Sequence, residues 1–108
     1  MASESRLELT LRVQLEQADI AFEQEFRFDP TRRYRSDFFI PGGNLLVEIE
    51  GGIFRGDVGH NSIGGIKRDI EKQALAVSLG YTVLRVHSDQ VTHGDALAII
   101  RQVLGVAA

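Results

Sequence analysis

The chain contains no cysteine, and this absence excludes disulfide bonds, thiolate zinc sites and thiol nucleophiles. Long apolar runs are also missing from its start. The segment MASESRLELTLRVQLEQ carries charges throughout, so neither a signal peptide nor a membrane span is expected there. The sequence shows no internal repeat, linker or low-complexity tract. We therefore expect a cytoplasmic protein.

An excess of positive charge is absent as well, because 12 Lys and Arg stand against 15 Asp and Glu, for a net charge of −3. This balance argues at first against a nucleic-acid partner. The middle of the chain differs, since residues 27–72 carry eight basic and seven acidic side chains. If three of these carboxylates hold a metal, the remainder is basic. A locally basic face on an acidic protein can still bind a phosphate backbone.

The length of 108 residues, 44% of them hydrophobic, is sufficient for one compact domain spanning 1–108. Apolar periodicity predicts an α-β-β-β-α-β-α order. A helix between the third and fourth strands implies a right-handed crossover and a mixed sheet. The glycine-rich stretch 51–65 is predicted to be a loop long enough to carry function. Helices are expected at 4–17, 66–79 and 95–104, and strands at 22–28, 34–40, 45–50 and 81–86.

The most informative segment is YRSDFFIPGGNLLVEIEGG, which predicts a hairpin around a Pro-Gly-Gly-Asn turn. If the hairpin is centred on Gly42 and Gly43, Asp37 lies directly opposite Glu48. Like charges in facing positions destabilise a sheet, and Glu50 follows on the same face. Three carboxylates on one face need a cation to offset them. Mg²⁺ binds through one or two carboxylates and substrate phosphates, so this segment predicts metal-dependent phosphodiester chemistry.

The hairpin suggests a division of roles. Asp37 and Glu48 can share one Mg²⁺, and the carbonyl of Ile49 can add a further oxygen ligand. Glu50 can polarise the attacking water or bind a second metal. A simpler interpretation stays open, because Glu50 also falls opposite Arg35 and can form an ordinary cross-strand ion pair. The carboxylates can equally be solvated residues of a sheet face.

The pattern of Asp37 followed by Glu48-x-Glu50 resembles the PD-(D/E)XK nuclease superfamily. The longer string DFFIPGGNLLVEIEGG, then His60-x-x-x-Gly64, Asp69-x-x-Lys72 and GYTVLRV, resembles small phage-type endonucleases related to very-short-patch-repair, Holliday-junction-resolvase and VRR-type nucleases. This resemblance extends from about Glu8 to Leu104. It implies a single-domain α/β, restriction-endonuclease-like αβββαβ core, in a bacterial or phage-infected cell. It also implies hydrolysis of DNA, dependent on Mg²⁺ or Mn²⁺, to 5′-phosphate and 3′-hydroxyl ends.

Carried over residue by residue, the resemblance makes Asp37 and Glu48 metal ligands. Glu50 stands where the superfamily most often has lysine, and Lys72 on the following helix can supply the missing cation. An ordinary helix-surface pair with Asp69 is the alternative for Lys72. Glu8 matches a position from which many members direct another carboxylate to the metal, and the neighbouring Glu4 is the competing choice.

Four basic residues and one histidine complete the predicted site. Arg33 and Arg35 share the Asp37 face and suit bidentate contacts to backbone phosphates. Arg55 and Lys67 are expected to bind DNA with them. His60, in the glycine-rich loop, is expected to relay a proton or contact phosphate.

The sequence thus predicts an Mg²⁺-dependent endodeoxyribonuclease. Two alternatives stay open: a DNA-binding module on the same fold that does not cut, and a nuclease-accessory subunit whose acidic patch meets a basic partner. No helix-turn-helix, zinc module or stacked-aromatic platform is recognisable, so nothing in the sequence is predicted to read base identity. Symmetrical cutting of a duplex or junction would favour a twofold homodimer.

Overall fold

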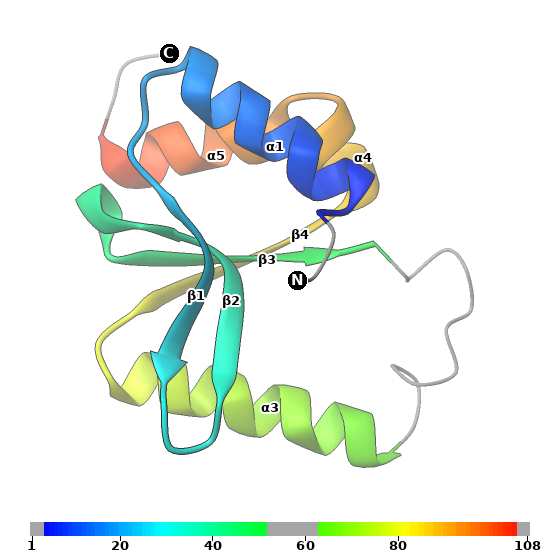
Figure 1. The fold of residues 1–108 in the computed structure, drawn as a ribbon, viewed down its shortest axis with the longest axis vertical. Helices are drawn as coiled ribbons and strands as arrows, with labels where there is room; N and C mark the ends of the chain where they lie inside the picture. Colours follow the sequence, from blue (N-terminus) through cyan, green and yellow to red (C-terminus); the bar gives the residue numbers. More distant parts are fainter. Residues whose placement is uncertain (1–3, 52–62, 106–108) are drawn as a thin grey trace.

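The computed structural model describes residues 4–51 and 63–105, which form a four-stranded sheet with helices on both faces (Figure 1). Helices α1, α4 and α5 cover one face, and α3 covers the other. None of the helices within these ranges is both long and apolar enough to cross a membrane. The elements in chain order are α1 (Arg6–Gln17), β1 (Glu23–Asp29), β2 (Tyr34–Ile40), the 3₁₀ turn η1 (Pro41–Gly43), β3 (Leu45–Glu50), α3 (Ile63–Ser78), β4 (Thr82–His87), α4 (Ser88–Thr92) and α5 (Asp95–Leu104).

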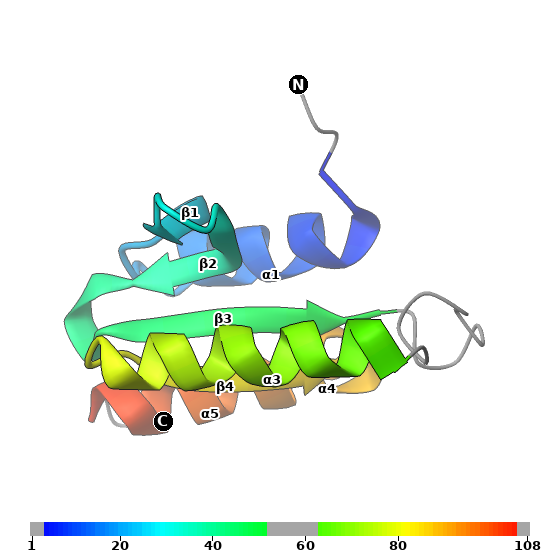
Figure 2. The ribbon, with the colours of Figure 1, turned by 90° about the horizontal axis from the view of Figure 1, so that it is seen from below.

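The sheet is mixed, as the sequence predicts. Its strands lie in the order β1-β2-β3-β4, with antiparallel β1–β2 and β2–β3 pairs and a parallel β3–β4 pair. Because parallel strands need a crossover connection, α3 lies between β3 and β4 in the chain. Figure 2 shows the β1–β2 hairpin bending away from the flatter β3–β4 pair.

The predicted register of the central hairpin is confirmed for the three pairs next to the turn, but the ladder does not extend to the predicted pair of Asp37 with Glu48. Phe38 faces Val47, Phe39 faces Leu46 and Ile40 faces Leu45, so facing residues have numbers that add to 85. The turn between the strands is compact because Gly43 approaches α5, where an added Cβ would lie 3.2 Å from side-chain atoms of Val103 and Leu104.

Alternation along the strands divides the hydrophobic residues into two cores. The larger core lies under α1, α4 and α5, and the smaller one under α3. Phe38 and Val47 belong to the larger core, whereas Phe39 and Leu46 belong to the smaller one. The face that carries Leu46 is also the face on which the sequence places Glu48 and Glu50.

The structure differs from the prediction at the start of α3 and in one additional helix. The predicted loop was to run to Gly65, but α3 begins at Ile63, so Gly64 and Gly65 are helical. Glycine is a weak helix former, which is why the sequence predicts a loop at Gly64 and Gly65. Helix α4 was not predicted, because its five residues are too few to show periodicity. A capping box between His87 and Gln90 starts it.

Candidate metal centre

Asp37 lies where β2 separates from β3. Paired residues of these strands run only from Phe38 to Ile40, so the backbone ladder stops one residue short of Asp37. Beyond that point the two strands are joined by hydrogen bonds between side chains of β2 and the backbone of β3. The Asp37 carboxylate accepts a hydrogen bond from the Ile49 N–H at 2.7 Å, and the buried Ser36 hydroxyl lies 3.0 Å from the Val47 carbonyl oxygen. The Asp37 carboxylate is therefore fixed in position by the backbone of β3.

The outer hairpin brings a second carboxylate, Glu25, to the same place. Gln24 faces Phe38 and Phe26 faces Ser36, so the register sets Glu25 opposite Asp37. Glu25 has a φ of 52°, within the left-handed region that non-glycine residues rarely occupy inside a strand. Glu25 is exposed, while Asp37 is half-buried. The sequence prediction did not include Glu25.

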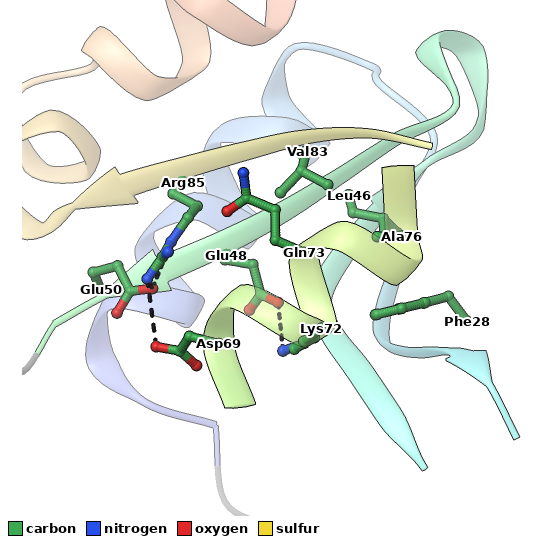
Figure 3. Close-up of a pocket in the computed structure, with 10 residues that line it drawn as sticks. All are labelled: Phe28, Leu46, Glu48, Glu50, Asp69, Lys72, Gln73, Ala76, Val83 and Arg85. Atoms are coloured by element: carbon green, nitrogen blue, oxygen red, sulfur yellow. Dashed lines mark hydrogen bonds and ion pairs between the residues drawn. The ribbon is translucent and has the colours of Figure 1, made fainter. Parts of the chain in front are cut away.

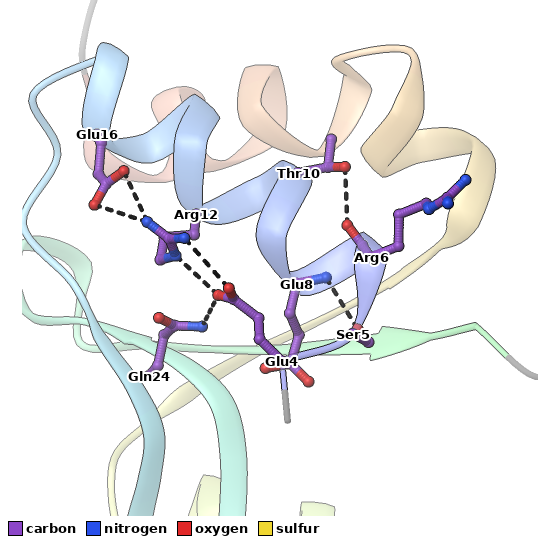
Figure 4. A network of polar contacts seen from close by, with 8 residues as sticks. All are labelled: Glu4, Ser5, Arg6, Glu8, Thr10, Arg12, Glu16 and Gln24. Atoms are coloured by element: carbon purple, nitrogen blue, oxygen red, sulfur yellow. Dashed lines mark hydrogen bonds and ion pairs between the residues drawn. The ribbon is translucent and has the colours of Figure 1, made fainter. Parts of the chain in front are cut away.

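Glu8 is the third carboxylate of this group. Its backbone N–H donates to the Ser5 hydroxyl at 3.1 Å, which caps α1, and its side chain extends from the helix toward the strands (Figure 4). One carboxylate oxygen each of Glu8, Glu25 and Asp37 lies within 4.8 Å of the other two. We call these three residues the acid cluster. Since hard divalent cations prefer oxygen ligands, the donors of the acid cluster suit Mg²⁺ or Mn²⁺.

Glu4, the alternative to Glu8, lies in a different environment. Its carboxylate forms an ion pair with Arg12 at 2.8 Å and accepts a hydrogen bond from Gln24 at 2.7 Å (Figure 4). These contacts lower the pKa of Glu4, with the hydrogen bond from Arg12 contributing most. The structure thus places Glu8 with Asp37 and gives Glu4 cationic and amide partners instead.

Burial and repulsion between carboxylates shift Glu8 and Asp37 toward their protonated forms. Burial, followed by the charges of Asp37 and Glu25, raises the pKa of Glu8 to about 7. Burial also raises the pKa of Asp37, although the hydrogen bond from Ile49 opposes the shift. Raised pKa values of this kind indicate carboxylates that lie close together without enough nearby positive charge to stabilise their ionised forms. A bound cation would offset the repulsion.

Glu48 lines a cleft between the sheet and α3 that is open to solvent (Figure 3). Its carboxylate forms an ion pair with the Lys72 ammonium at 2.5 Å. Burial nevertheless raises the pKa of Glu48 to about 6, and the charges of Asp37 and Glu50 contribute. The structure therefore places Glu48 beside Lys72 and near Asp37, but Asp37 and Glu48 are not paired across the strands as the sequence predicts.

Glu50 lines the same cleft but has an unexpected partner. Arg85 of β4, not Arg35, forms its ion pair, and the Arg85 guanidinium also lies 3.7 Å from the Asp69 carboxylate (Figure 3). The parallel register explains this contact, because Arg85 faces Glu48 and therefore lies next to Glu50. Arg85 could not be predicted, since nothing local determines the register of two strands joined by a long crossover.

The remaining predicted residues are distributed around this centre. Arg33 and Arg35 are exposed, and the charge of Arg35 lowers the pKa of Glu8, so Arg35 lies near the acid cluster. Lys67 is exposed on α3, five residues and thus about 140° around the helix from Lys72. It lies away from the cleft. Arg55 and His60 fall outside the described residues.

No protein family model matches the chain, and no curated protein matches it in sequence. The chemistry of the site therefore has to be inferred from its own geometry. That geometry comprises the fixed Asp37 carboxylate, the neighbouring carboxylates of Glu8 and Glu25, and a cleft in which Glu48 and Glu50 are ion-paired with Lys72 and Arg85.

Proposed function

We propose that this protein is a metal-dependent endonuclease that hydrolyses DNA phosphodiester bonds, giving 5′-phosphate and 3′-hydroxyl ends. The observation that carries the proposal is the position of Asp37, which belongs to the acid cluster and lies close enough to Glu48 of the cleft to raise the pKa of Glu48. The sequence resemblance to PD-(D/E)XK nucleases supports the proposal, because the matching motif assigns metal-ligand roles to Asp37 and Glu48. The mixed sheet with flanking helices is compatible with the restriction-endonuclease-like αβββαβ core that the resemblance implies.

In this proposal the metal would be held by Asp37, together with Glu8 and Glu25 of the acid cluster or with Glu48. Mg²⁺ or Mn²⁺ bound there would neutralise charge on the phosphoryl oxygens and lower the pKa of a water ligand. Asp37 would keep its orientation throughout, since its hydrogen bond to the Ile49 N–H uses one carboxylate oxygen and leaves the other available. The Ile49 carbonyl stays a proposed further ligand.

In the proposed mechanism Lys72 stabilises negative charge and Glu50 accepts a proton. The Lys72 ammonium positions Glu48 and supplies the cation that the Glu50 position lacks, so it would stabilise negative charge on the phosphate or leaving oxygen. Glu50 would accept the proton of the attacking water once the Arg85 guanidinium turns from it to a phosphate. The exposed Arg33 and Arg35 would hold the DNA backbone beside the acid cluster.

A second candidate function is a module on the same fold that binds DNA without cutting it. The ion pairs of Glu48 with Lys72 and of Glu50 with Arg85 favour this candidate, because they satisfy both carboxylates without a metal. A nuclease-accessory subunit, which would bind neither metal nor DNA, is the third.

A cleavage assay separates these functions. Supercoiled, linear, nicked, flapped and four-way-junction DNA would be incubated with the protein in Mg²⁺, Mn²⁺ or Ca²⁺. The endonuclease cuts at least one substrate in Mg²⁺ or Mn²⁺, and Asp37→Asn abolishes cutting. The matched control is Glu16→Gln, which changes a carboxylate paired with Arg12 outside the site and should cut like the wild type. Binding in Ca²⁺ without products in any metal indicates the second candidate. Equal cutting by wild type and Asp37→Asn would refute the proposal.

A further inference from the structure

Helix α3 is apolar on two opposite faces. On the inner face Leu75 and Ala76 pack in the smaller core. The outer face carries a second row of apolar side chains that are exposed to solvent. Within residues 4–51 and 63–105, α3 is the only helix on its side of the sheet (Figures 1 and 2). We call this row the outer stripe; it consists of Ile63, Ile66, Ile70, Ala74 and Val77, and the exposed fractions of its larger members are 79% for Ile63, 47% for Ile66, 63% for Ile70 and 57% for Val77.

The spacing of the outer stripe is that of a helix-pairing seam. Successive members are three, four, four and three residues apart, which keeps them on one line along the helix. A surface helix normally directs one apolar stripe at its own core and presents polar residues on the opposite side. A contiguous exposed apolar row bordered by charges is typical of a protein–protein contact.

We propose that the outer stripe binds the outer stripe of a second copy of this chain, with the two α3 helices antiparallel about a twofold axis that passes beside Ile70. In this arrangement Ile70 meets the partner's Ile70, and Ile66 meets the partner's Ala74. Ile63 meets the partner's Val77 at each end. Large side chains thus face small or β-branched ones along the whole row.

Charge complementarity identifies the occupant as a second copy. Lys67 and Glu71 are both exposed on the same flank of the stripe, and neither has an ion-pair partner within residues 4–51 and 63–105. A twofold axis between antiparallel helices brings the same flank of both copies together. Lys67 then lies next to the partner's Glu71, and Glu71 next to the partner's Lys67. One surface therefore supplies both halves of two ion pairs, as an isologous interface requires.

The expected dimer is a weak one. Helix α3 has 16 residues and is thus about 24 Å long. A single pair of such helices lies at the low end of the interface sizes that support stable association, so dimerisation should depend on concentration. The proposal does not depend on the endonuclease function, because the outer stripe lies on the side of α3 opposite Lys72 and the cleft.

Sedimentation equilibrium of the full chain over a range of concentrations tests the proposal. The wild type should shift from monomer to dimer, and Ile70→Asp should stay monomeric with an unchanged circular dichroism spectrum. Lys67→Glu and Glu71→Lys should each weaken the dimer at least tenfold, and the double swap Lys67→Glu/Glu71→Lys should restore it. Arg68→Glu, a charge reversal on the far side of the helix, is the matched control and should leave the dimer unchanged.

Cysteine pairing tests the direction of the helices, because the chain has no cysteine of its own. An oxidised mixture of Ile66→Cys and Ala74→Cys chains should give the mixed disulfide dimer, and each variant alone should give little. Three outcomes would overturn the proposal: a monomer at every attainable concentration, a dimer insensitive to Ile70→Asp, or disulfides formed by Ala74→Cys alone, which would indicate parallel helices.

Discussion

The Asp37 carboxylate accepts a hydrogen bond from the Ile49 N–H at 2.7 Å, and the same carboxylate belongs to the acid cluster. One side chain therefore has a structural role, as a bridge between β2 and β3, and a proposed chemical role as a metal ligand. The two roles respond differently to substitution. An asparagine keeps the oxygen acceptor and removes the charge, whereas an alanine removes both.

Asp37→Asn and Asp37→Ala should consequently differ in stability. Without divalent metal, Asp37→Asn should unfold at the same or a higher urea concentration than the wild type, because it relieves repulsion from Glu8 and Glu25. Asp37→Ala should be less stable than Asp37→Asn by about 1–3 kcal/mol, since the Ile49 N–H loses its partner. Urea titrations in EDTA measure both free energies. Identical stabilities would show that the hydrogen bond is not important.

In the metal-free protein, the contribution of Glu8 to the free energy of unfolding should decrease as the pH rises from about 4.5 to 7. The folded state raises the pKa of Glu8 from 4.5 to about 7, so the folded chain binds more protons than the unfolded chain in this range. The contribution of Glu8 is most favourable below pH 4.5. Melting temperatures of the wild type minus those of Glu8→Gln should therefore decrease between pH 5 and pH 8. A flat or increasing difference would contradict the assigned pKa.

Lys72→Met should destabilise the protein at pH 8 and much less at pH 5. At the higher pH it leaves the partly buried Glu48 carboxylate without its cation, at a cost of about 1–3 kcal/mol. At the lower pH Glu48 is protonated, because its pKa is about 6. The double variant Lys72→Met/Glu48→Gln should recover most of the loss at pH 8. Equal destabilisation of both variants would instead indicate lost packing of the Lys72 chain.

Ser36→Ala should reduce the free energy of unfolding by about 1 kcal/mol, the usual contribution of a buried hydrogen bond. Its hydroxyl is buried and lies 2.8 Å from the Phe38 carbonyl oxygen and 3.0 Å from that of Val47. The matched control is Ser78→Ala, because the Ser78 hydroxyl bonds the Leu75 carbonyl in an exposed position. Thermal denaturation should show a clear loss for Ser36→Ala and almost none for Ser78→Ala.

Features specified by short stretches of sequence could be predicted. The bounds of β2 and β3, the register of their hairpin and the face shared by Glu48 and Glu50 all follow from two-residue alternation around a Pro-Gly-Gly-Asn turn. The mixed sheet follows from the order of the elements. The predicted direct pairing of Asp37 with Glu48 is not part of this ladder, which ends at Phe38, although the two carboxylates are near enough to repel each other.

Features that depend on contacts between distant segments could not be predicted from the sequence. Arg85 reaches Glu50 only through the parallel register of β3 and β4, which the packing of α3 decides.

Glu25 could have been found, because aligning the strand before Asp29 with β2 places it opposite Asp37. Its left-handed backbone interrupts the regular alternation on which such an alignment relies.

The most direct test of the proposed metal centre is a crystal structure of the protein soaked in Mn²⁺, with anomalous diffraction used to locate the ion. The proposal predicts an anomalous peak within about 2.0–2.3 Å of an Asp37 carboxylate oxygen, with Glu8, Glu25 or Glu48 completing the protein ligands. The same soak of Asp37→Asn crystals should show no peak there. A Mn²⁺ ion bound elsewhere, or none near Asp37 at a concentration that supports cleavage, would contradict the proposal.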